Sequence, residues 1–398
     1  MDALKMELSH LMKQRELLRF NFCSFKQNNV DNTQKLLALT RLLDNNYAYG
    51  LYNARTTADI MAYLATETAE NKTEIITLLS LKLMVFPEKQ PQLLPLLIAN
   101  KKPWLQLIAL EVAEMLGEHL SYNFDFISIM GFELSAQNNA LALHGKTSLL
   151  VSVLLHLYQR KTLNTYLSVV LPDDTNNVDP PVKISPLIRL YIDILSGNDV
   201  NIDAIAEQLI SHDLLQSTLF DIFVSSLDEV QVTAFINKLS TEELHTESVI
   251  YAMALSGYIK FIPFITQYLQ QPAFATHAHN ALRLVLGEKL DAFIPLDVQF
   301  DSDSAQKTTN LGYYSAKLLN AWQQQQSLLL GFDNREKYAN DKSINKISRM
   351  LNGQSLSIDT LDSVVTLGSQ WHRYVAMLYK QHFTNQTYVN HPHALEVC

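Results

Sequence analysis

An internal duplication constrains the fold of this chain more than any other feature of its sequence. Two stretches, 71–120 and 246–290, share one order of features: a Thr-Glu dipeptide, an apolar helical segment, two spaced prolines, a second helical segment and a Leu-Gly-Glu-x-Leu motif. The matching residues are Thr73-Glu74, Pro95, Pro103 and 116–120 in the first copy, and Thr246-Glu247, Pro263, Pro272 and 286–290 in the second. Helical units of roughly forty residues are typical of HEAT and armadillo solenoids, in which each unit buries its apolar face against its neighbours. We therefore predict an all-α solenoid of HEAT-like antiparallel helix pairs.

Composition agrees with a mainly helical chain and excludes several classes of ligand. The 398 residues are 47% apolar, with 11 glycines and 12 prolines, and both of these residues are rare in helices. The two cysteines, Cys23 and Cys398, are too far apart in sequence for a CxxC metal site and too few for a disulfide framework. A formal net charge of −9 without a long basic cluster disfavours nucleic acid and anionic membranes as main ligands.

The same features predict where the protein resides. No apolar run reaches the roughly twenty residues that a membrane span needs. The N-terminus shows no apolar segment behind a basic start, so we expect no secretory signal. A soluble, cytoplasmic protein is the resulting expectation.

Apolar periodicity predicts four helical regions separated by polar segments. The separators are 172–181, which contains Pro180 and Pro181, and 297–310. The predicted regions are an N-terminal helical region at 1–70, a first HEAT-like array at 71–171, a second at 182–296, and a helical C-terminal cap at 311–385.

Local patterns add finer expectations. Asn28 to Thr33 predicts a polar break before a helix that begins near Gln34. The paired prolines of each repeat predict helix starts, because proline fits the first turn of a helix and little else in it. Near the C-terminus, helices are expected at 343–352 and 357–383.

Groups that resemble catalytic or ligand sites lack the partners such sites need. Gly145-Lys146-Thr147-Ser148 matches the end of a phosphate-binding loop, but position 140 is alanine where that loop needs glycine. A loop that connects helices is therefore predicted there. His277 and His279 are two residues apart on a predicted helix, so their side chains point in different directions.

The remaining candidates are weaker. Asp297, Asp301 and Asp303 lack the glycine and glutamate of a calcium loop, and His391-Pro392-His393 with Cys398 belongs to a predicted tail. Core packing is expected for the tryptophans, with an interface anchor as the alternative; they are Trp104, Trp322 and Trp371. We predict no catalytic, cofactor-binding or metal-binding residue, and no cofactor.

Three patterns, taken in order, resemble one protein family. They are Leu42-Leu43-Asp44 with Gly50-Leu51 and Ala54; the repeat from Ala254-Leu255-Ser256-Gly257 through Pro263 and Pro272 to 286–290; and 368–373 with Ala376. Together they resemble an uncharacterised family of bacterial HEAT-repeat proteins that are often encoded beside type VI secretion genes of Gram-negative bacteria. The chain departs from the family pattern over 331–337. The resemblance implies a cytoplasmic accessory or adaptor protein and no reaction.

The predicted function is therefore protein binding by a non-enzymatic scaffold or adaptor, with a secretion-system component or effector as its partner. A HEAT-like enzyme that acts on nucleic-acid bases or on bound tetrapyrroles is the alternative. A base-acting enzyme needs a basic concave groove, which the charge of −9 disfavours. A tetrapyrrole enzyme needs a deep pocket with a reactive cysteine or acid. The sequence leaves self-association open.

Overall fold

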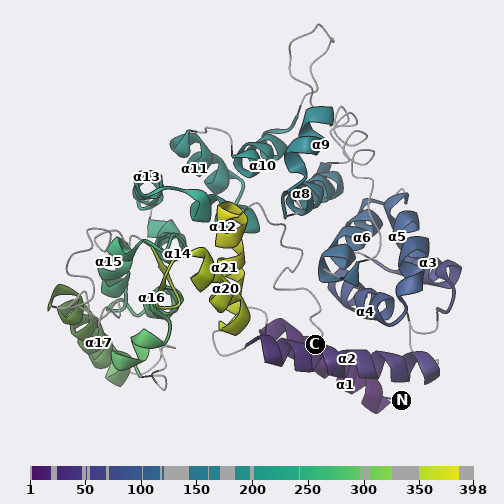
Figure 1. The fold of residues 1–398 in the computed structure, drawn as a ribbon, viewed down its shortest axis with the longest axis horizontal. Coiled ribbons are helices and arrows are strands. Elements are labelled where there is room, and N and C mark those ends of the chain that lie inside the picture. Colours follow the sequence, from purple (N-terminus) through teal and green to yellow (C-terminus); the bar gives the residue numbers. More distant parts are fainter. Residues whose placement is uncertain are drawn as a thin grey trace, which may run out of the picture. The chain divides into compact units, whose positions relative to one another are not determined.

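Helices form nearly all of the regular structure of this chain (Figure 1). The computed structural model describes residues 2–18, 25–46, 51, 54–68, 71–100, 102–116, 119–120, 143–159, 161–170, 184–197, 201–241, 243–295, 298, 305–324 and 349–384. These residues belong to two compact units, with unit 1 within residues 1–198 and unit 2 within residues 199–384. The predicted all-α class is confirmed for this part of the chain, to which one two-stranded hairpin is added.

Unit 1 is built around a succession of packed helices, in which α2, α4, α6, α8 and α10 each contact the next. Of the other helices, α1 packs on α2, α5 packs on α6, and α9 packs on α8 and α10. The elements of unit 1 are α1 (Asp2–Leu18), α2 (Lys26–Asn46), α3 (Thr57–Thr66), α4 (Lys72–Val85), η3 (Pro87–Lys89), α5 (Gln90–Ile98), α6 (Pro103–Leu116), α8 (Leu143–Gln159), α9 (Leu163–Val170) and α10 (Pro186–Ser196).

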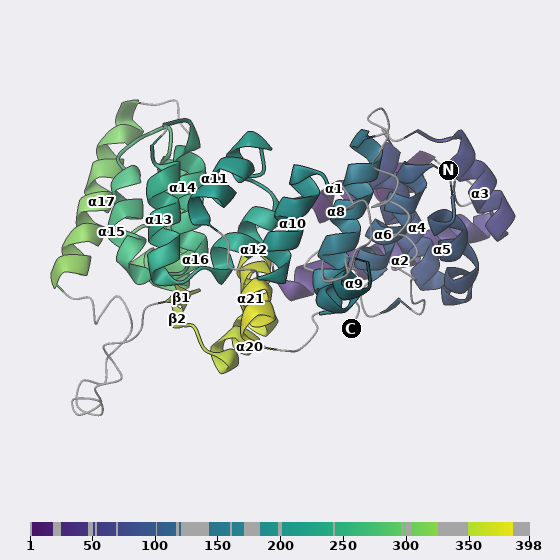
Figure 2. The same ribbon diagram turned by 90° about the horizontal axis from the view of Figure 1, so that it is seen from above.

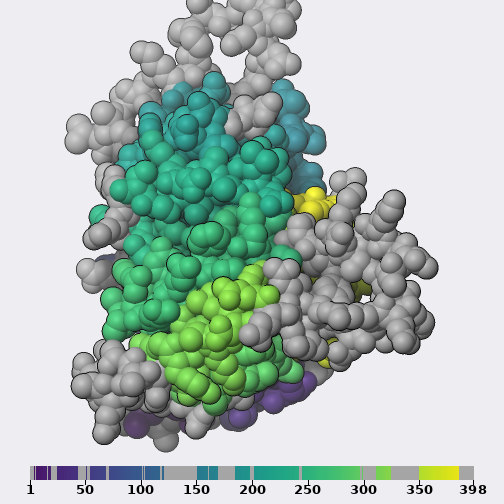
Figure 3. All heavy atoms as spheres, turned by 90° about the vertical axis from the view of Figure 1, so that its left-hand side faces the viewer, coloured from purple at the N-terminus to yellow at the C-terminus, as the bar shows by residue number. Residues whose placement is uncertain are grey.

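Unit 2 repeats this kind of packing. Helices α12, α14 and α16 pack in succession, α13 and α15 pack on α14, α11 contacts α13, and α17 contacts α15 (Figure 2). In Figure 3, α17 is the light-green helix that lies against the green helices before it. The elements are α11 (Ile202–Ser211), α12 (Thr218–Ser226), α13 (Glu229–Leu239), η7 (Glu243–His245), α14 (Thr246–Leu255), η8 (Ile259–Phe261), α15 (Ile262–Tyr268), α16 (Ala275–Leu286), η9 (Gly287–Ala292), α17 (Ala305–Gln324), β1 (Met350–Leu351), β2 (Gln354–Ser355), α20 (Ile358–Leu367) and α21 (Gln370–Phe383).

The two sequence repeats have the same order of elements, but each has three helical parts rather than a simple pair. The first copy is α4, η3 with α5, and α6; the second is α14, η8 with α15, and α16. Pro103 begins α6 and Pro263 lies in the first turn of α15, as predicted. Pro95 instead lies inside α5, and Pro272 precedes α16. The proline prediction was therefore wrong at these two positions.

The duplication also extends to the helix before each repeat. Both α3 and α13 begin with a capping box, in which a side chain at the helix start and one three residues on bond reciprocally to the backbone. The first residue of α3, Thr57, contacts Gln92 (Oγ1 to Oε1, 3.3 Å), and the first residue of α13, Glu229, pairs with Lys260 (3.0 Å). Gln92 lies within α5 and Lys260 in η8, so the two contacts reach neighbouring parts of the second helical segment of each copy. The repeated structure is thus longer than the repeated sequence motif.

The polar segment 28–33 does not break a helix, because tertiary contacts override its local preference. It lies inside α2, and three of its polar side chains, Asn29, Asn32 and Thr33, are buried against α1. The Arg15 guanidinium donates to Asn29 Oδ1 (3.0 Å) and to Thr33 Oγ1 (3.2 Å), and Asn32 Nδ2 donates to the Leu11 carbonyl (3.1 Å). The asparagines that suggested a loop therefore form a polar contact between two helices.

The helix predicted at 343–352 is wrong over its described residues, which form a β-hairpin. Strands β1 and β2 pair antiparallel around Asn352 and Gly353, which have φ angles of 51° and 73°. Two consecutive positive φ angles define the type I′ turn that Asn-Gly favours in two-residue hairpins. The Asn-Gly dipeptide is a turn signal in the sequence, and here it outweighs the apolar pattern that favoured a helix.

Three further expectations need adjustment. The helix predicted at 357–383 is interrupted at Gly368, so α20 and α21 are separate. Helix α17 begins at Ala305, inside the polar segment predicted for 297–310. The backbone of 145–148 lies within α8 rather than in a loop. The separator 172–181, the departure at 331–337 and the tail after 384 lie outside the described residues.

Candidate functional site

The most extensive convergence of polar groups in unit 2 is made by residues 349–384, which we call the C-terminal clip. The clip contains β1, β2, α20 and α21, and it lies over the carboxyl ends of α12, α14 and α16 (Figure 1). The last carbonyls of a helix have no partner within that helix. The clip provides donors for them: Arg349 to Leu227 O, Tyr379 Oη to Leu255 O (2.5 Å), Met350 N to Gly257 O (2.8 Å), His372 Nε2 to Arg283 O (3.0 Å), Asn352 N to Leu284 O (3.0 Å) and Gly353 N to Val285 O (2.8 Å).

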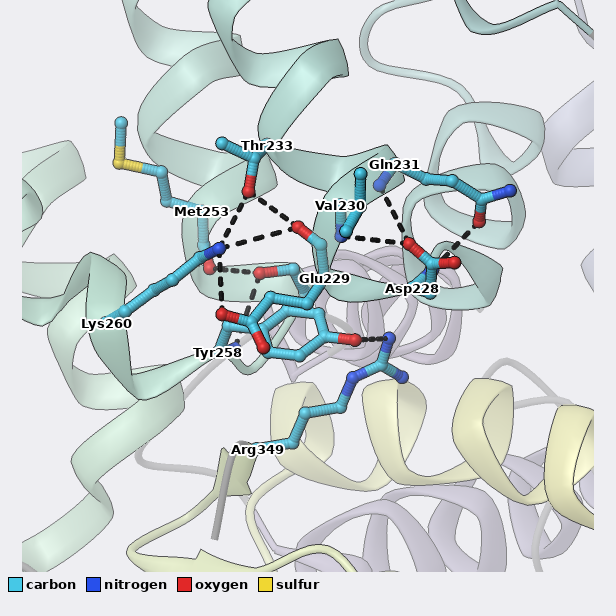
Figure 4. Close-up of polar contacts among 10 residues, drawn as sticks. Asp228, Glu229, Val230, Gln231, Thr233, Met253, Tyr258, Lys260 and Arg349 are labelled. Carbon is cyan, nitrogen blue, oxygen red and sulfur yellow. Dashed lines mark hydrogen bonds and ion pairs between the residues drawn. The ribbon is translucent and has the colours of Figure 1, made fainter. Parts of the chain in front are cut away.

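Arg349 is the cation of this contact. Its guanidinium donates to the Leu227 carbonyl, at the carboxyl end of α12, and to Tyr258 Oη (2.6 Å) (Figure 4). The guanidinium carbon lies 4.3 Å from the centre of the Tyr258 ring and 5.8 Å from that of Tyr379. A cation is favoured both over aromatic faces and beside a helix carboxyl end, where the peptide dipoles are negative. Arg349 therefore links α12 to the segment after α14.

A second cation lies beside Tyr258 but is much more exposed. Lys260 Nζ lies 3.0 Å from Glu229 Oε1 and 2.7 Å from Thr233 Oγ1, both on α13 (Figure 4). The side chains of Lys260 and Glu229 are 37% and 53% exposed. Water and salt screen ion pairs of this kind. This pair orients the start of α15 on α13 and contributes little to stability.

The exposure of this ion pair gives a first prediction. Replacing Lys260 with methionine will lower the free energy of unfolding by about 1 kcal/mol or less, because the pair is screened while the aliphatic stem is kept. Urea unfolding of Lys260→Met, Glu229→Gln and the double variant will measure the coupling between the two residues. A coupling above about 2 kcal/mol would contradict the assignment of the pair as a surface contact.

Three glycines allow the clip hairpin to approach the helix ends. Gly257, Gly287 and Gly353 all have positive φ angles, of 70°, 57° and 73°. A Cβ atom on Gly287 would lie 2.7 Å from the carbonyl carbon of Asn352, and one on Gly353 would lie 2.7 Å from the Leu286 carbonyl oxygen. A side chain at either position would push the hairpin off α16.

A buried carboxylate lies where α21 crosses α12. Tyr374 Oη donates to Asp221 Oδ2 (2.6 Å), and the Tyr251 hydroxyl also bonds to this carboxylate. Burial raises the pKa of Asp221 from 3.8 to about 6, although both hydrogen bonds act in the opposite direction. One turn further along α12, Ser225 Oγ lies 2.9 Å from His382 Nε2. These pairs fix the position of α21 on α12.

Two histidines near the end of α16 are held neutral. Burial lowers the pKa of His372 from 6.5 to about 4, and the nearby Arg283 charge acts in the same direction. His279 has its pKa lowered to about 4 by burial and then by Arg283. Arg283 itself forms an ion pair with Asp291. Because a carbonyl oxygen cannot donate, His372 Nε2 carries the hydrogen that it shares with Arg283 O.

The polar groups at the contact of α21 with α12 are mostly buried and bond within the fold. Ser225 is 1% exposed, and its hydroxyl donates to the Ile222 carbonyl (3.0 Å), so its hydrogen is not directed at His382. The Asp221 carboxylate is enclosed by tyrosine hydroxyls. Among the residues that the structure describes, no group of three or more histidine, cysteine or acidic side chains has the arrangement of a metal site.

One surface feature occurs in both repeats. Leu96 follows Pro95 and is 49% exposed, and Phe264 follows Pro263 and is 53% exposed. The next residue in each copy, Leu97 or Ile265, is fully buried. Single exposed apolar side chains are ordinary on protein surfaces. An exposed large apolar side chain therefore follows the matched proline of each copy, although Leu96 is the seventh residue of α5 and Phe264 is the third residue of α15.

The tryptophans and histidines that the sequence offered as candidate site residues lie mainly in packing contacts where the structure describes them. Trp322 is buried, as predicted, while Trp104 and Trp371 are partly buried. Trp371 packs edge-on against Tyr251, with ring centres 6.0 Å apart. His277 Nε2 lies 3.4 Å from Glu247 Oε2 on α14. The candidates outside the described residues are Asp297, Asp301, Asp303, His391, His393, Cys23 and Cys398.

The residues that fasten the clip were missed in the sequence. Asp221 follows apolar residues in a short helix, and only the amphipathic pattern of that helix places it toward the interior. Arg349 precedes the Asn-Gly hairpin, but no local signal connects it to a carbonyl 122 residues earlier in the chain.

No known protein family, curated protein or solved structure matches this chain. Within the described part of the chain, every helix is too short or too polar to be a candidate for crossing a membrane.

Proposed function

We propose that this chain is a non-enzymatic scaffold that binds another protein through the outer faces of its repeated helical units. The observation that carries this proposal is the pair of exposed apolar side chains, Leu96 and Phe264, that follow the matched prolines of the two sequence repeats. Burying the exposed half of such a side chain on a partner stabilises a complex by about 1 kcal/mol. The polar convergence under the clip, by contrast, is used inside the fold.

The fold behind this proposal is a solenoid of HEAT-like helix pairs. The successive packing of α2, α4, α6, α8 and α10 in unit 1, and of α12, α14 and α16 in unit 2, supports it. In a solenoid each helix pair contacts mainly its neighbours, and the faces that are left form an extended binding surface. The clip then serves as the cap that ends the array, because it covers the carboxyl ends of α12, α14 and α16.

The partner that we propose is a component or effector of a bacterial type VI secretion system. The sequence patterns at 42–54, 254–290 and 368–376 support this choice through their resemblance to a family encoded beside such systems. The chain acts there as an adaptor in the cytoplasm and carries out no reaction of its own.

Surface substitutions at the two repeated positions test the binding proposal. The double variant Leu96→Ser with Phe264→Ser will recover at least about tenfold less partner than the unaltered chain, in affinity purification from the native host read by mass spectrometry. Its thermal midpoint should remain within a few degrees of the unaltered value, because both side chains are about half exposed. Each single variant should lose part of the binding.

The matched control is Leu244→Ser in η7, which is 86% exposed and not part of the repeated feature. It should leave partner recovery unchanged. Equal recovery by the double variant and the unaltered chain would exclude the outer faces of α5 and α15 as the binding surface. Recovery of a secretion protein would support the partner choice, and reproducible recovery of an unrelated protein would replace it.

A further inference from the structure

Two buried ionisable groups lie where the C-terminal clip meets the rest of unit 2. One is Asp221 on α12, which Tyr374 of α21 contacts. The other is His372, which lies on α21 two positions before Tyr374 and contacts α16. Tyr374 donates to Asp221 on α12 (2.6 Å), and His372 lies against the Arg283 carbonyl on α16 (3.0 Å). Both contacts require α21 to be docked, so docking changes the surroundings of both groups.

Asp221 is surrounded by hydroxyls rather than by cations. Tyr251 of α14 and Tyr374 of α21 bond to its carboxylate. The described residues provide no ion pair for Asp221. A buried carboxylate without a cation favours its neutral form. Docking of α21 therefore favours a proton on Asp221, consistent with its raised pKa of about 6.

His372 has the opposite preference. It is 4% exposed and contacts Ser369 Oγ (2.8 Å) within the clip. From α16, Arg283 presents both its carbonyl and its positive charge. Asp291 forms an ion pair with Arg283, and the charges of both residues act on His279. Burial next to a cation favours neutral imidazole. Docking therefore removes a proton from His372, consistent with its lowered pKa of about 4.

We propose that docking of the C-terminal clip is proton-balanced: Asp221 binds a proton as the clip docks, while His372 releases one. The two linked titrations then oppose each other over the same range of pH. Removing either group converts the clip into a pH-sensitive contact, and the two removals act in opposite directions.

The sign and size of each effect follow from linkage. The pKa of Asp221 is higher in the docked state, about 6 against 3.8, so lowering the pH from 7.5 to 5 strengthens docking about tenfold. The pKa of His372 is lower in the docked state, about 4 against 6.5, so the same change weakens docking about thirtyfold. The contribution of His279 has the sign of that of His372, and it cancels when variants that retain His279 are compared.

Trp371 provides a reporter inside the clip, because its ring packs against Tyr251 of α14. The chain has three tryptophans, so Trp104→Phe with Trp322→Phe leaves Trp371 as the single tryptophan, which can be excited apart from the tyrosines. Urea titrations of this background at pH 5 and pH 7.5 give the docking equilibrium at each pH. The comparison holds whether the clip leaves first or unit 2 unfolds with it, because both end states hydrate Asp221 and His372.

Asp221→Asn in this background should make the weakening on acidification about tenfold larger, and His372→Gln should make it about thirtyfold smaller. Tyr374→Phe removes a hydrogen bond to ionised Asp221, so it should shift the pH response in the same direction as His372→Gln. If His372→Gln does not fold, the pH response of Tyr374→Phe tests the proposal in its place. An Asp221→Asn response equal to that of the background, or shifts of Asp221→Asn and Tyr374→Phe in the same direction, would overturn the proposal.

Discussion

Replacing Gly287 with alanine will destabilise unit 2 by about 3–5 kcal/mol, a large part of the 5–15 kcal/mol typical of a whole domain. Gly287 has φ 57° and ψ −137°, a backbone conformation that residues with a side chain avoid. The new Cβ would also lie 2.7 Å and 2.9 Å from the carbonyl carbon and oxygen of Asn352. Relief of this overlap moves the hairpin and breaks its bonds to Leu284 and Val285. Urea unfolding followed by circular dichroism will measure the loss.

Two other glycines separate the causes of this effect. Gly197 has φ 68° but no atom within 4 Å of an added Cβ, so Gly197→Ala reports backbone strain alone, about 1–2 kcal/mol. Gly312 lies in α17 with open space around it, so Gly312→Ala should be neutral or slightly stabilising. An effect of Gly287→Ala no larger than that of Gly197→Ala would show that the hairpin does not rest tightly on α16.

The Arg349→Ala variant should lose about 2–4 kcal/mol of stability. The substitution leaves the Leu227 carbonyl without this donor and removes the charge that stacks on Tyr258. One guanidinium nitrogen, Nη2, makes both hydrogen bonds, and the flat guanidinium lies over the Tyr258 ring. Lysine at this position keeps the charge but lacks this flat group, so Arg349→Lys should recover only part of the loss. Near-ultraviolet circular dichroism of the tyrosine bands, combined with urea unfolding, will measure both variants.

Arg189 is the matched control for removal of an arginine. Its side chain is 63% exposed, and its guanidinium lies 4.0 Å from Asp193, one turn along α10. Arg189→Ala should therefore change stability by no more than about 0.5 kcal/mol. If Arg349→Ala matched this small effect, Arg349 would not fasten the clip to α12.

Local chemistry made much of the helical fold predictable. The capping residues Thr56 and Asp228 and the Leu-Gly ends of the repeats act within a few residues of their own positions, and the structure contains the corresponding helix boundaries. The same local reasoning failed at positions whose conformation depends on residues far away in the sequence. Asn29 and Asn32 are poor helix formers, yet bonds to α1 hold them inside α2. The low helix propensity of these asparagines is outweighed by the hydrogen bonds that their buried side chains make.

The clip contacts could not be derived from one sequence. Tyr374 bonds to Asp221 across 153 residues, and His382 contacts Ser225 across 157 residues. No pattern of period 2 or 3.6 carries information about such pairs. Leu96 and Phe264 are different in this respect, because each follows a proline that the sequence repeat matches and precedes an apolar residue that is buried. Their exposure was therefore accessible to a closer comparison of the two copies.

The order of the chain gives the clip a consequence for synthesis. Helices α12, α14 and α16 leave the ribosome before residues 349–384, whereas several donors for their last carbonyls, among them Arg349 and Tyr379, belong to that later segment. Unit 2 therefore cannot complete its hydrogen bonding while its C-terminal part is still being translated. Contacts this distant in sequence close slowly, because the chain between them must first be ordered. The nascent array remains open at its carboxyl ends throughout that interval, which is when a chaperone or a neighbouring chain has access to them.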